Sequence, residues 1–211
     1  MLPDEPPHDC PLCPRLKGFR EKNRELYPDY FNNPVPVWNG VAPRLVVVGL
    51  APGLKGANRT GRPFTGDYAG DLLYATLKKF GLAEGEYRQS PDDSLRLTGA
   101  MIVNAVRCVP PQNKPTPEEI RTCRQFLIGA IEAQPAARVF LALGRIAHES
   151  LLRAFGVRLA AYPFAHGAEH QLPGGEVVFD SYHCSRYNTN TGVLTTAMFE
   201  DVVGRAAQKA A

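Results

Sequence analysis

Four short apolar runs along the chain alternate with longer segments whose apolar residues recur every three or four positions. The runs are Leu45–Val48, Ala100–Val106, Arg138–Leu143 and Val177–Tyr182. Short runs rich in apolar and β-branched residues are typical of parallel strands buried on both faces. The segments between them have the spacing of amphipathic helices. This pattern predicts an α/β protein, a three-layer α/β/α sandwich with a central, mainly parallel four-stranded sheet.

Local signals mark where several of the expected helices begin. Asp67 is well placed as the N-cap of a helix carrying Leu72, Leu73 and Leu77. Thr116 followed three residues later by Glu119, with a proline between them, predicts a capping box. The charged segment Arg15–Glu25 is expected to form a short helix, and a last helix closes the chain.

Three loops rich in polar residues follow three of the four expected strands. The first, from Gly49 to Asp67, combines glycines, basic residues and Phe64, but matches neither the dinucleotide fingerprint nor the phosphate-binding loop. The others cover residues 104–114 and 183–188. Because ligands of parallel sheets bind beyond the carboxyl ends of the strands, these loops are expected to meet at one site.

Length, composition and charge set limits on the class of protein. The chain has 211 residues, 44% of them hydrophobic, and a formal net charge of +3. We expect a single domain over residues 1–211, because this apolar share suits one core. No apolar run approaches the ~20 residues that span a bilayer, so no membrane association is expected. We expect a cytoplasmic protein, and its charge permits a polyanionic partner.

The cysteines suggest metal binding rather than disulfides. Cys10 and Cys13 form a C-x-x-C pair with no preceding strand, while Cys108 follows a strand and Cys123 lies on the inward face of a helix. Four such thiols suit zinc or an iron–sulfur cluster, and the sequence alone leaves both open. The fifth, Cys184, is expected to pack inward. His148 is interpreted as a surface or packing residue, not as a ligand.

Longer motifs resemble those of a known family. They are C-P-L-C-P-R-L near the start, G-L-A-P-G, N-R-T-G-R-P-F-T-G-D, V-R-C-V-P-P-Q-N-K-P-T-P-E-E, A-L-G-R-I-A and S-Y-H-C-S-R-Y-N-T. In this order they resemble the iron–sulfur uracil-DNA glycosylases of type B, or family 5, over nearly the whole chain. The resemblance implies a DNA repair hydrolase that flips uracil, and also deaminated purines such as hypoxanthine, out of DNA and cleaves the N-glycosidic bond. It also implies a monomer that is associated with the nucleoid.

The resemblance also implies a cofactor and a set of site residues. It implies a structural 4Fe–4S cluster, with an N-terminal cluster-binding segment at about residues 8–25, and ligands Cys10, Cys13, Cys108 and Cys123. It implies catalytic roles for Asp67, His183 and Asn113, and base-binding roles for Gly49, Ala51, Phe64, Asn104 and His183. DNA contacts are expected from Lys55, Arg59, Arg62, Lys114, Ser185 and Arg186.

Several alternatives stay open at this stage. Asp67 either takes part in catalysis or only caps its helix, and Asn104 either reads the base or ties the strand end to backbone. A cluster- or zinc-containing nucleic-acid-binding module without catalysis would share the thiols and the basic loops. A cysteine-dependent hydrolase would instead need Cys184 as a thiolate.

Overall fold

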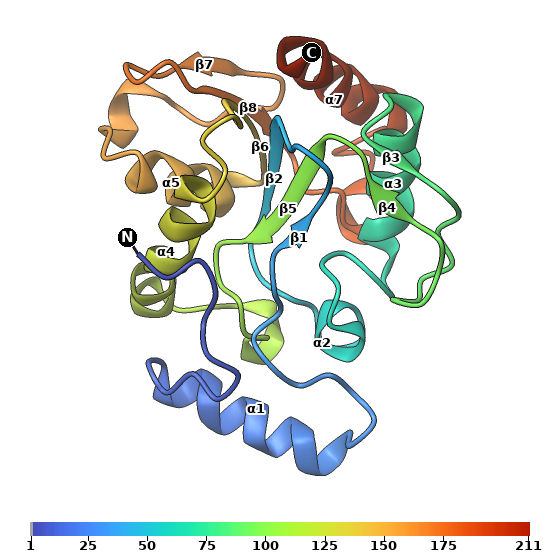
Figure 1. Cartoon of the computed structure of the whole chain (residues 1–211), viewed down its shortest axis with the longest axis vertical. Helices are drawn as coiled ribbons and strands as arrows, with labels where there is room; N and C mark the ends of the chain where they lie inside the picture. The colour runs from blue at the N-terminus through green and yellow to red at the C-terminus, as the bar shows by residue number, and fades with distance from the viewer. Residues whose placement is uncertain (1) are drawn as a thin grey trace.

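The computed structural model describes residues 2–211 and shows a central sheet covered by helices on both faces (Figure 1). The sheet has six strands in the order β1-β5-β2-β6-β8-β7. Its strands are β1 (Trp38–Asn39), β2 (Leu45–Gly49), β5 (Ala100–Asn104), β6 (Val139–Leu143), β7 (Glu169–Gln171) and β8 (Val177–Ser181). A separate two-stranded sheet pairs β3 (Ala83–Glu84) with β4 (Arg96–Leu97).

The four predicted strands are the parallel centre of the sheet, but the predicted number of strands was wrong. Strands β5, β2, β6 and β8 pair in parallel, and every residue in them is buried. The sheet continues on each side with one antiparallel strand, β1 on β5 and β7 on β8. These edge strands have only two and three residues. They are too short to produce an apolar run of their own.

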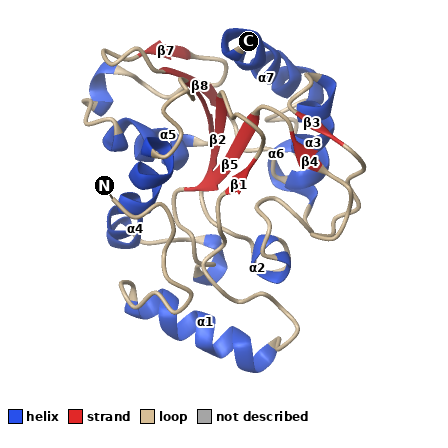
Figure 2. Cartoon of the chain, viewed as in Figure 1, coloured by secondary structure: helices blue, strands red, loops and turns tan. Residues whose placement is uncertain are grey.

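Helices cover both faces of the sheet (Figure 2). They bury two separate apolar clusters, one on each face. One face packs against α3 (Tyr68–Lys79) and α7 (Thr196–Ala210), the other against α4 (Pro117–Glu132) and α5 (Arg145–Ala154). The remaining helices are α1 (Pro14–Leu26), α2 (Ala57–Thr60), α6 (Arg186–Asn190) and the 3₁₀ turns η1 (Pro111–Asn113) and η2 (Leu159–Ala161). The three-layer α/β/α prediction is therefore confirmed. Within residues 2–211, no helix has the length and apolar character needed to cross a membrane.

The predicted helix caps form as expected. The Thr116 side chain accepts from the Glu119 amide at 3.2 Å, and the Glu119 carboxylate accepts from the Thr116 amide at 2.7 Å. Arg15 on α1 donates two further hydrogen bonds to the same carboxylate, at 2.8 and 2.7 Å. One capping box thus also ties the N-terminal helix to α4.

Candidate active site

The three loops that follow the strand ends surround one cavity of about 580 Å³. The sequence-predicted residues that line it are Ala51, Lys55, Phe64, Asp67, Asn104, Asn113, His183, Ser185 and Arg186. The first predicted loop also contributes Leu50, Pro52, Gly53, Ala57 and Gly66 to the lining, whereas no sequence signal indicated Tyr68 and Ala69 at the start of α3. This volume is in the range of small-molecule sites, and the cavity lies where the parallel-sheet rule places a ligand.

Gly49, Phe64 and Asn104 pack closely beneath the cavity. A Cβ atom on Gly49 would come within 2.4 Å of the Asn104 Oδ1 atom and 2.7 Å of the Phe64 Cζ atom. Only glycine therefore allows both side chains to approach the end of β2. Asn104 is 3% exposed, and among residues 2–211 its side-chain amide has no protein hydrogen-bond partner. Its donor and acceptor are thus available to a ligand.

His183 follows the end of β8 and faces the same cavity. Its ring stacks on the Phe64 ring, with 5.9 Å between centroids and 27° between planes. Its main-chain carbonyl accepts a hydrogen bond of 2.8 Å from the Asn188 side chain, which fixes the loop. Desolvation lowers the pKa of His183 to about 4. At neutral pH the imidazole is therefore uncharged and offers one N–H donor.

The lowered pKa of His183 gives an expected dependence of stability on pH. The unfolded chain binds this proton below about pH 6.5 and the folded protein only below about pH 4, so the free energy of unfolding falls as pH drops through that window. The contribution is at most roughly 3 kcal/mol. Urea unfolding at pH 4–7 should therefore show a weaker pH dependence in His183→Asn than in wild type.

The matched control for this experiment is Gln208→Asn, because Gln208 is exposed on α7 and carries no side-chain group that titrates at pH 4–7. Its pH dependence should equal that of the wild type. If His183→Asn also retained the full wild-type slope, a depressed His183 pKa would be ruled out.

Asp67 is the N-cap of α3 and also lines the cavity. Its Oδ1 atom accepts a hydrogen bond of 3.1 Å from the Ala69 amide at the start of α3. Its Oδ2 atom faces Gly56 so closely that a Cβ there would lie 2.2 Å from it. Burial raises the pKa of Asp67, although hydrogen bonds from the Gly70 and Ala69 amides oppose that rise. The two interpretations made from the sequence are thus geometrically compatible.

Asn113 reaches the cavity from the turn η1, on the opposite loop. Gln112 and Asn113 both adopt positive φ angles, 56° and 57°, a conformation that asparagine tolerates better than most residues. Asp67 and Asn113 therefore contribute to one cavity from segments that lie far apart in the sequence.

The basic residues expected to contact DNA fall into two groups. Lys55 and Arg186 line the cavity, and Arg59 and Lys114 are exposed on the same loops. The Arg186 guanidinium lies 5.4 Å from the centroid of the Tyr68 ring. Ser185 accepts from the Asn188 amide at 3.4 Å, so it caps α6 as well as lining the cavity. These side chains form a local basic rim.

Arg62 requires a correction, because the structure buries it. Its guanidinium donates two hydrogen bonds to Asp93, at 2.8 and 2.9 Å, and lies 4.7 Å from the centroid of the Trp38 ring. The residue is 6% exposed. The DNA contact expected of Arg62 is therefore not supported, because its guanidinium group is buried and paired with the Asp93 carboxylate. Asp93 lies 31 residues away in the sequence, so no local sequence pattern could predict this ion pair.

Cys184 is fully buried, as the sequence analysis expected. Its thiol donates a weak hydrogen bond to the Ala69 carbonyl at 3.5 Å. Burial raises the pKa of the Cys184 thiol to about 12. A cysteine-dependent hydrolase needs an accessible thiolate, so this geometry does not favour that alternative.

The other four cysteines line a second, small cavity together with residues of α1. Cys10, Cys108 and Cys123 are buried, Cys13 is partly exposed, and all four are free thiols. Arg20 donates to the Cys108 sulfur at 3.5 Å, and the Arg107 amide donates to the Cys123 sulfur at 3.4 Å. Within residues 2–211 the buried Nε atom of Arg20 has no partner. This donor set, rich in N–H groups and positive charge, fits an anionic thiolate-bound metal group.

His148 is a buried packing residue rather than a surface one. Asp180 bridges two histidines, with His148 Nδ1 at 2.7 Å and His170 Nε2 at 2.9 Å from its two oxygens. Tetrahedral ligands around one zinc ion at ~2.1 Å would lie about 3.4 Å apart, so these shorter distances indicate direct hydrogen bonds. The second His148 nitrogen bonds the Tyr162 carbonyl at 2.9 Å. The cluster therefore ties α5 to the β7–β8 hairpin.

Comparisons with known proteins show the family to which the chain belongs. The family model described as "Uracil DNA glycosylase superfamily" matches residues 36–206, so the chain belongs to that superfamily. A type-5 uracil-DNA glycosylase from Thermus thermophilus is 48% identical over 202 residues, which cover 93% of this chain and 92% of that protein. A type-5 enzyme from Pyrobaculum aerophilum is 40% identical, over 96% and 89%. A type-4 enzyme from the same organism is 33% identical, over 71% and 63%.

Proposed function

We propose that this protein is a DNA repair glycosylase that removes uracil from DNA and leaves an abasic site. The observation that carries the proposal is the convergence of Phe64, Asn104, His183 and Asp67 on one cavity at the carboxyl edge of the sheet. A base inside a duplex is out of reach of such a cavity, so the nucleotide must be flipped out of the stack. The matching type-5 relatives bear the name of this activity.

Four residues at or beneath the cavity are proposed to hold the base, namely Gly49, Ala51, Phe64 and Asn104. The ring of Phe64 stacks on the base, and the Asn104 amide pairs its donor and acceptor with the uracil edge. Gly49 permits both approaches, and Ala51 adds an apolar wall beside Leu50. This apolar wall also admits deaminated purines such as hypoxanthine, which we include in the proposed substrate range.

The reaction breaks the bond between C1′ of the sugar and the base nitrogen, and the water oxygen forms a new bond to C1′. The Asp67 carboxylate stabilises the positive charge that develops on the sugar and accepts the proton of the water that Asn113 helps to position. The neutral His183 donates a hydrogen bond to the base carbonyl, where negative charge develops as the base leaves. The abasic sugar keeps the hydroxyl group of the water, and the proton taken up by Asp67 passes through solvent to the released base.

The thiols of Cys10, Cys13, Cys108 and Cys123 are proposed to hold a structural 4Fe–4S cluster. Within residues 2–211 no three of these sulfurs lie within 4.8 Å of one another. A single zinc ion with ~2.3 Å bonds would hold its sulfurs about 3.8 Å apart, so this arrangement is wider than one zinc ion requires. The cluster, when bound, supplies a cross-link among α1, α4 and the loop after β5, and no step of the hydrolysis uses it.

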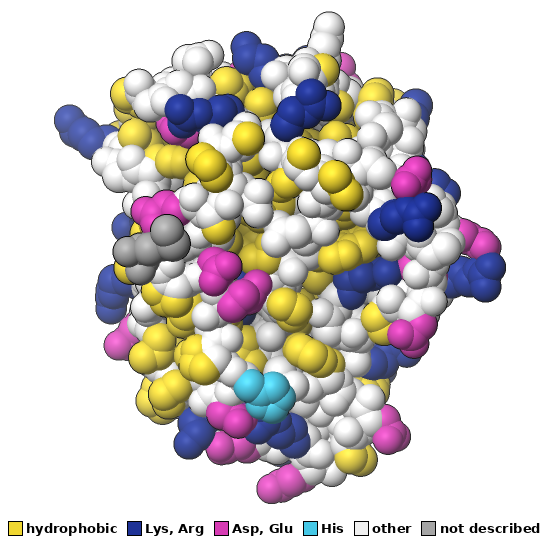
Figure 3. All heavy atoms as spheres, viewed as in Figure 1, with side chains coloured by type: hydrophobic (Ala, Val, Ile, Leu, Met, Phe, Trp, Pro, Cys, Tyr) yellow, Lys and Arg dark blue, Asp and Glu magenta, His cyan; other side chains and the backbone are white. Residues whose placement is uncertain are grey.

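DNA binding is proposed to come from a local rim and not from a strongly basic face. Figure 3 shows Lys and Arg side chains scattered among Asp and Glu side chains over the face in view. Lys55, Arg59, Lys114 and Arg186 instead gather on the loops around the cavity. The helix cap Ser185 and the backbone amides of the glycine-rich loop add uncharged phosphate contacts.

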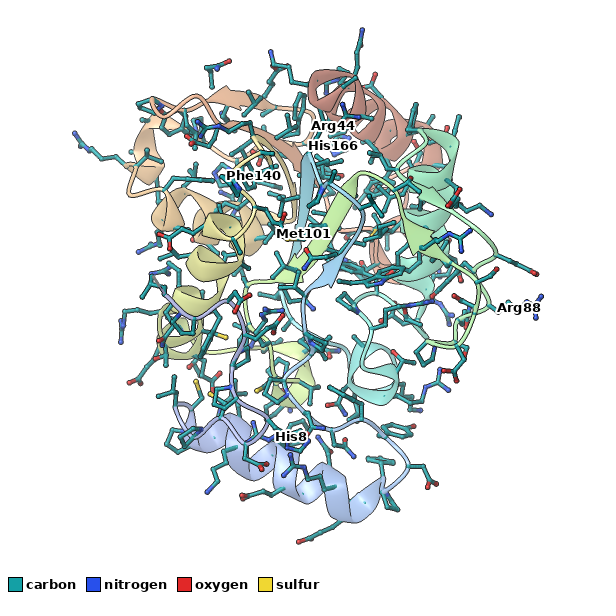
Figure 4. All side chains as sticks on the ribbon, in the orientation of Figure 1. His8, Arg44, Arg88, Met101, Phe140 and His166 are labelled. Carbon is teal, nitrogen blue, oxygen red and sulfur yellow. The ribbon has the colours of Figure 1, made fainter. Side chains whose placement is uncertain are left out.

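The rim gives an expected dependence of DNA affinity on salt. If its four cations each neutralise one phosphate, log Kd against log salt has a slope of about 4. Arg186→Ala should lower that slope by about 1. Arg44→Ala should leave the slope unchanged, because Arg44 lies at the amino end of β2, at the other end of the strand from the cavity (Figure 4). Fluorescence anisotropy with an abasic duplex at several salt concentrations measures both. An affinity independent of salt would contradict the rim.

The proposed activity is tested with labelled duplexes that carry one uracil or one hypoxanthine. Strand breaks that appear only after alkali indicate a monofunctional glycosylase, and the ratio of the two rates gives the substrate range. Binding to DNA without any alkali-labile product would instead indicate a non-catalytic binding module.

A further inference from the structure

Phe64 has a backbone conformation that a bulky residue adopts only under constraint. Its φ angle is 51°, in the left-handed region. For a residue other than glycine this conformation costs free energy and persists only where the surrounding structure holds it. Such outliers gather at functional sites, and Phe64 lies at the cavity. The contacts that hold this backbone are therefore of interest.

Two tyrosine hydroxyl groups hold the main chain on either side of the Phe64 ring. Tyr87 donates to the Phe64 carbonyl at 3.1 Å and accepts from the Gly66 amide at 3.3 Å. Tyr74 donates to the Pro63 carbonyl. Gly70 lets α3 approach, because a Cβ atom there would lie 1.9 Å from the Phe64 carbonyl oxygen and 2.4 Å from the Tyr87 hydroxyl. The ring itself takes part in none of these hydrogen bonds.

The ion pair between Arg62 and Asp93 holds the same loop from a second direction. Its two side chains are 7% and 0% exposed. The Nε atom of Arg62 donates to the Thr65 hydroxyl at 2.8 Å, next to Phe64. Asp93 also accepts hydrogen bonds from the amides of Arg88 and Leu95, in the loop between β3 and β4. Arg88 projects outward from the β3–β4 loop (Figure 4). Tyr87 and Asp93 instead contact the segment of residues 62–66.

We propose that Tyr87 and the Arg62–Asp93 pair are positioning residues that fix the Phe64 ring as a preformed stacking face for the flipped base. Tyr87, Arg62 and Asp93 do not line the cavity, so they act through the main chain of residues 62–66. A rigid ring needs no ordering when the base arrives, which favours binding of the base. The inference rests on the proposed function, specifically on stacking of the base on Phe64.

The test is a double-mutant cycle on the single-turnover rate of uracil excision. Tyr87→Phe removes one hydroxyl and should lower the rate about three- to tenfold, the effect of one hydrogen bond. Affinity for abasic product DNA should change less than about twofold, because that DNA carries no base to stack. In a Phe64→Ala background, Tyr87→Phe should have no further effect, because its target is gone.

Each result of the cycle supports or overturns a distinct statement. If Tyr87→Phe slows the Phe64→Ala enzyme by the same factor as the wild type, Tyr87 does not act through Phe64 and the inference fails. If Phe64→Ala alone excises uracil at the wild-type rate, stacking on Phe64 fails, and the inference with it, while the proposed activity stands. Loss of product affinity in Tyr87→Phe would indicate a general structural role and also overturn the inference.

Two further variants provide a control for Tyr87→Phe and a test of the Arg62–Asp93 ion pair. Tyr162→Phe is the matched control, because within residues 2–211 its hydroxyl makes no hydrogen bond and it packs in the other apolar cluster. It should retain the wild-type rate. Asp93→Asn keeps the side-chain shape but removes the charge that holds Arg62, and should reproduce the Tyr87→Phe pattern. Should Asp93→Asn not fold, the Tyr87 cycle still decides the question.

Discussion

Asp67→Asn is expected to lower the single-turnover rate of uracil excision about 10²- to 10⁴-fold, the range for loss of a general acid or base. The asparagine side chain caps a helix as well as aspartate does, so α3 should keep its N-terminus. What disappears is the carboxylate charge at the cavity, next to Gly53 and Gly56. Affinity for abasic product DNA and the melting temperature should stay close to wild type.

Two companion variants separate chemistry from capping. Asp67→Ala removes both functions, so it should be as slow as Asp67→Asn and in addition less stable by about 1 kcal/mol. Asp71→Asn alters a carboxylate in the first turn of the same helix that does not line the cavity, and should excise uracil normally. Wild-type activity in Asp67→Asn would show that Asp67 only caps α3.

Cys108→Ala is expected to abolish iron binding and to lower the melting temperature by on the order of 10 °C or more. A metal group bound only by the folded state contributes its binding free energy to folding, and each kcal/mol corresponds to about 2–4 °C in a chain of this size. The apolar contacts at this end are few, because the cluster of buried residues there contains Leu16, Val106, Phe126 and the cysteines. Iron analysis and visible absorbance of anaerobically purified protein provide the measurement.

The matched control is Cys184→Ala, a buried cysteine in a different apolar cluster. It should retain iron and visible absorbance in full. A colourless wild-type protein that contains zinc, or full iron retention in Cys108→Ala, would contradict the proposed cluster.

The sequence predicted the centre of the fold because the information for it is local. Runs such as Leu45–Val48 are fully buried in the sheet, and the capping box at Thr116 needs only four residues. The edge strands were missed because Trp38–Asn39 pairs along the side of β5 and has no pattern of its own. A strand of two residues exists only where a neighbouring strand offers its edge.

Site residues were predicted where one loop carries unusual chemistry, and missed where a role depends on distant partners. Phe64 and Asp67 stand out within a glycine-rich loop and do line the cavity. Arg62 stood out for the same reason, but its charge is neutralised by Asp93, in the loop between β3 and β4. Tyr87 had no local signal, because only the folded chain brings its hydroxyl to the Phe64 carbonyl.

The most direct test of the central claim is a crystal structure of Asp67→Asn bound to a duplex containing one uracil. We expect the uracil to lie outside the stack, with its ring on Phe64, its edge on the Asn104 amide and its carbonyl at His183. Density for uracil still paired and stacked in the duplex, or bound away from this cavity, would contradict the claim that the three loops form a base-excision site.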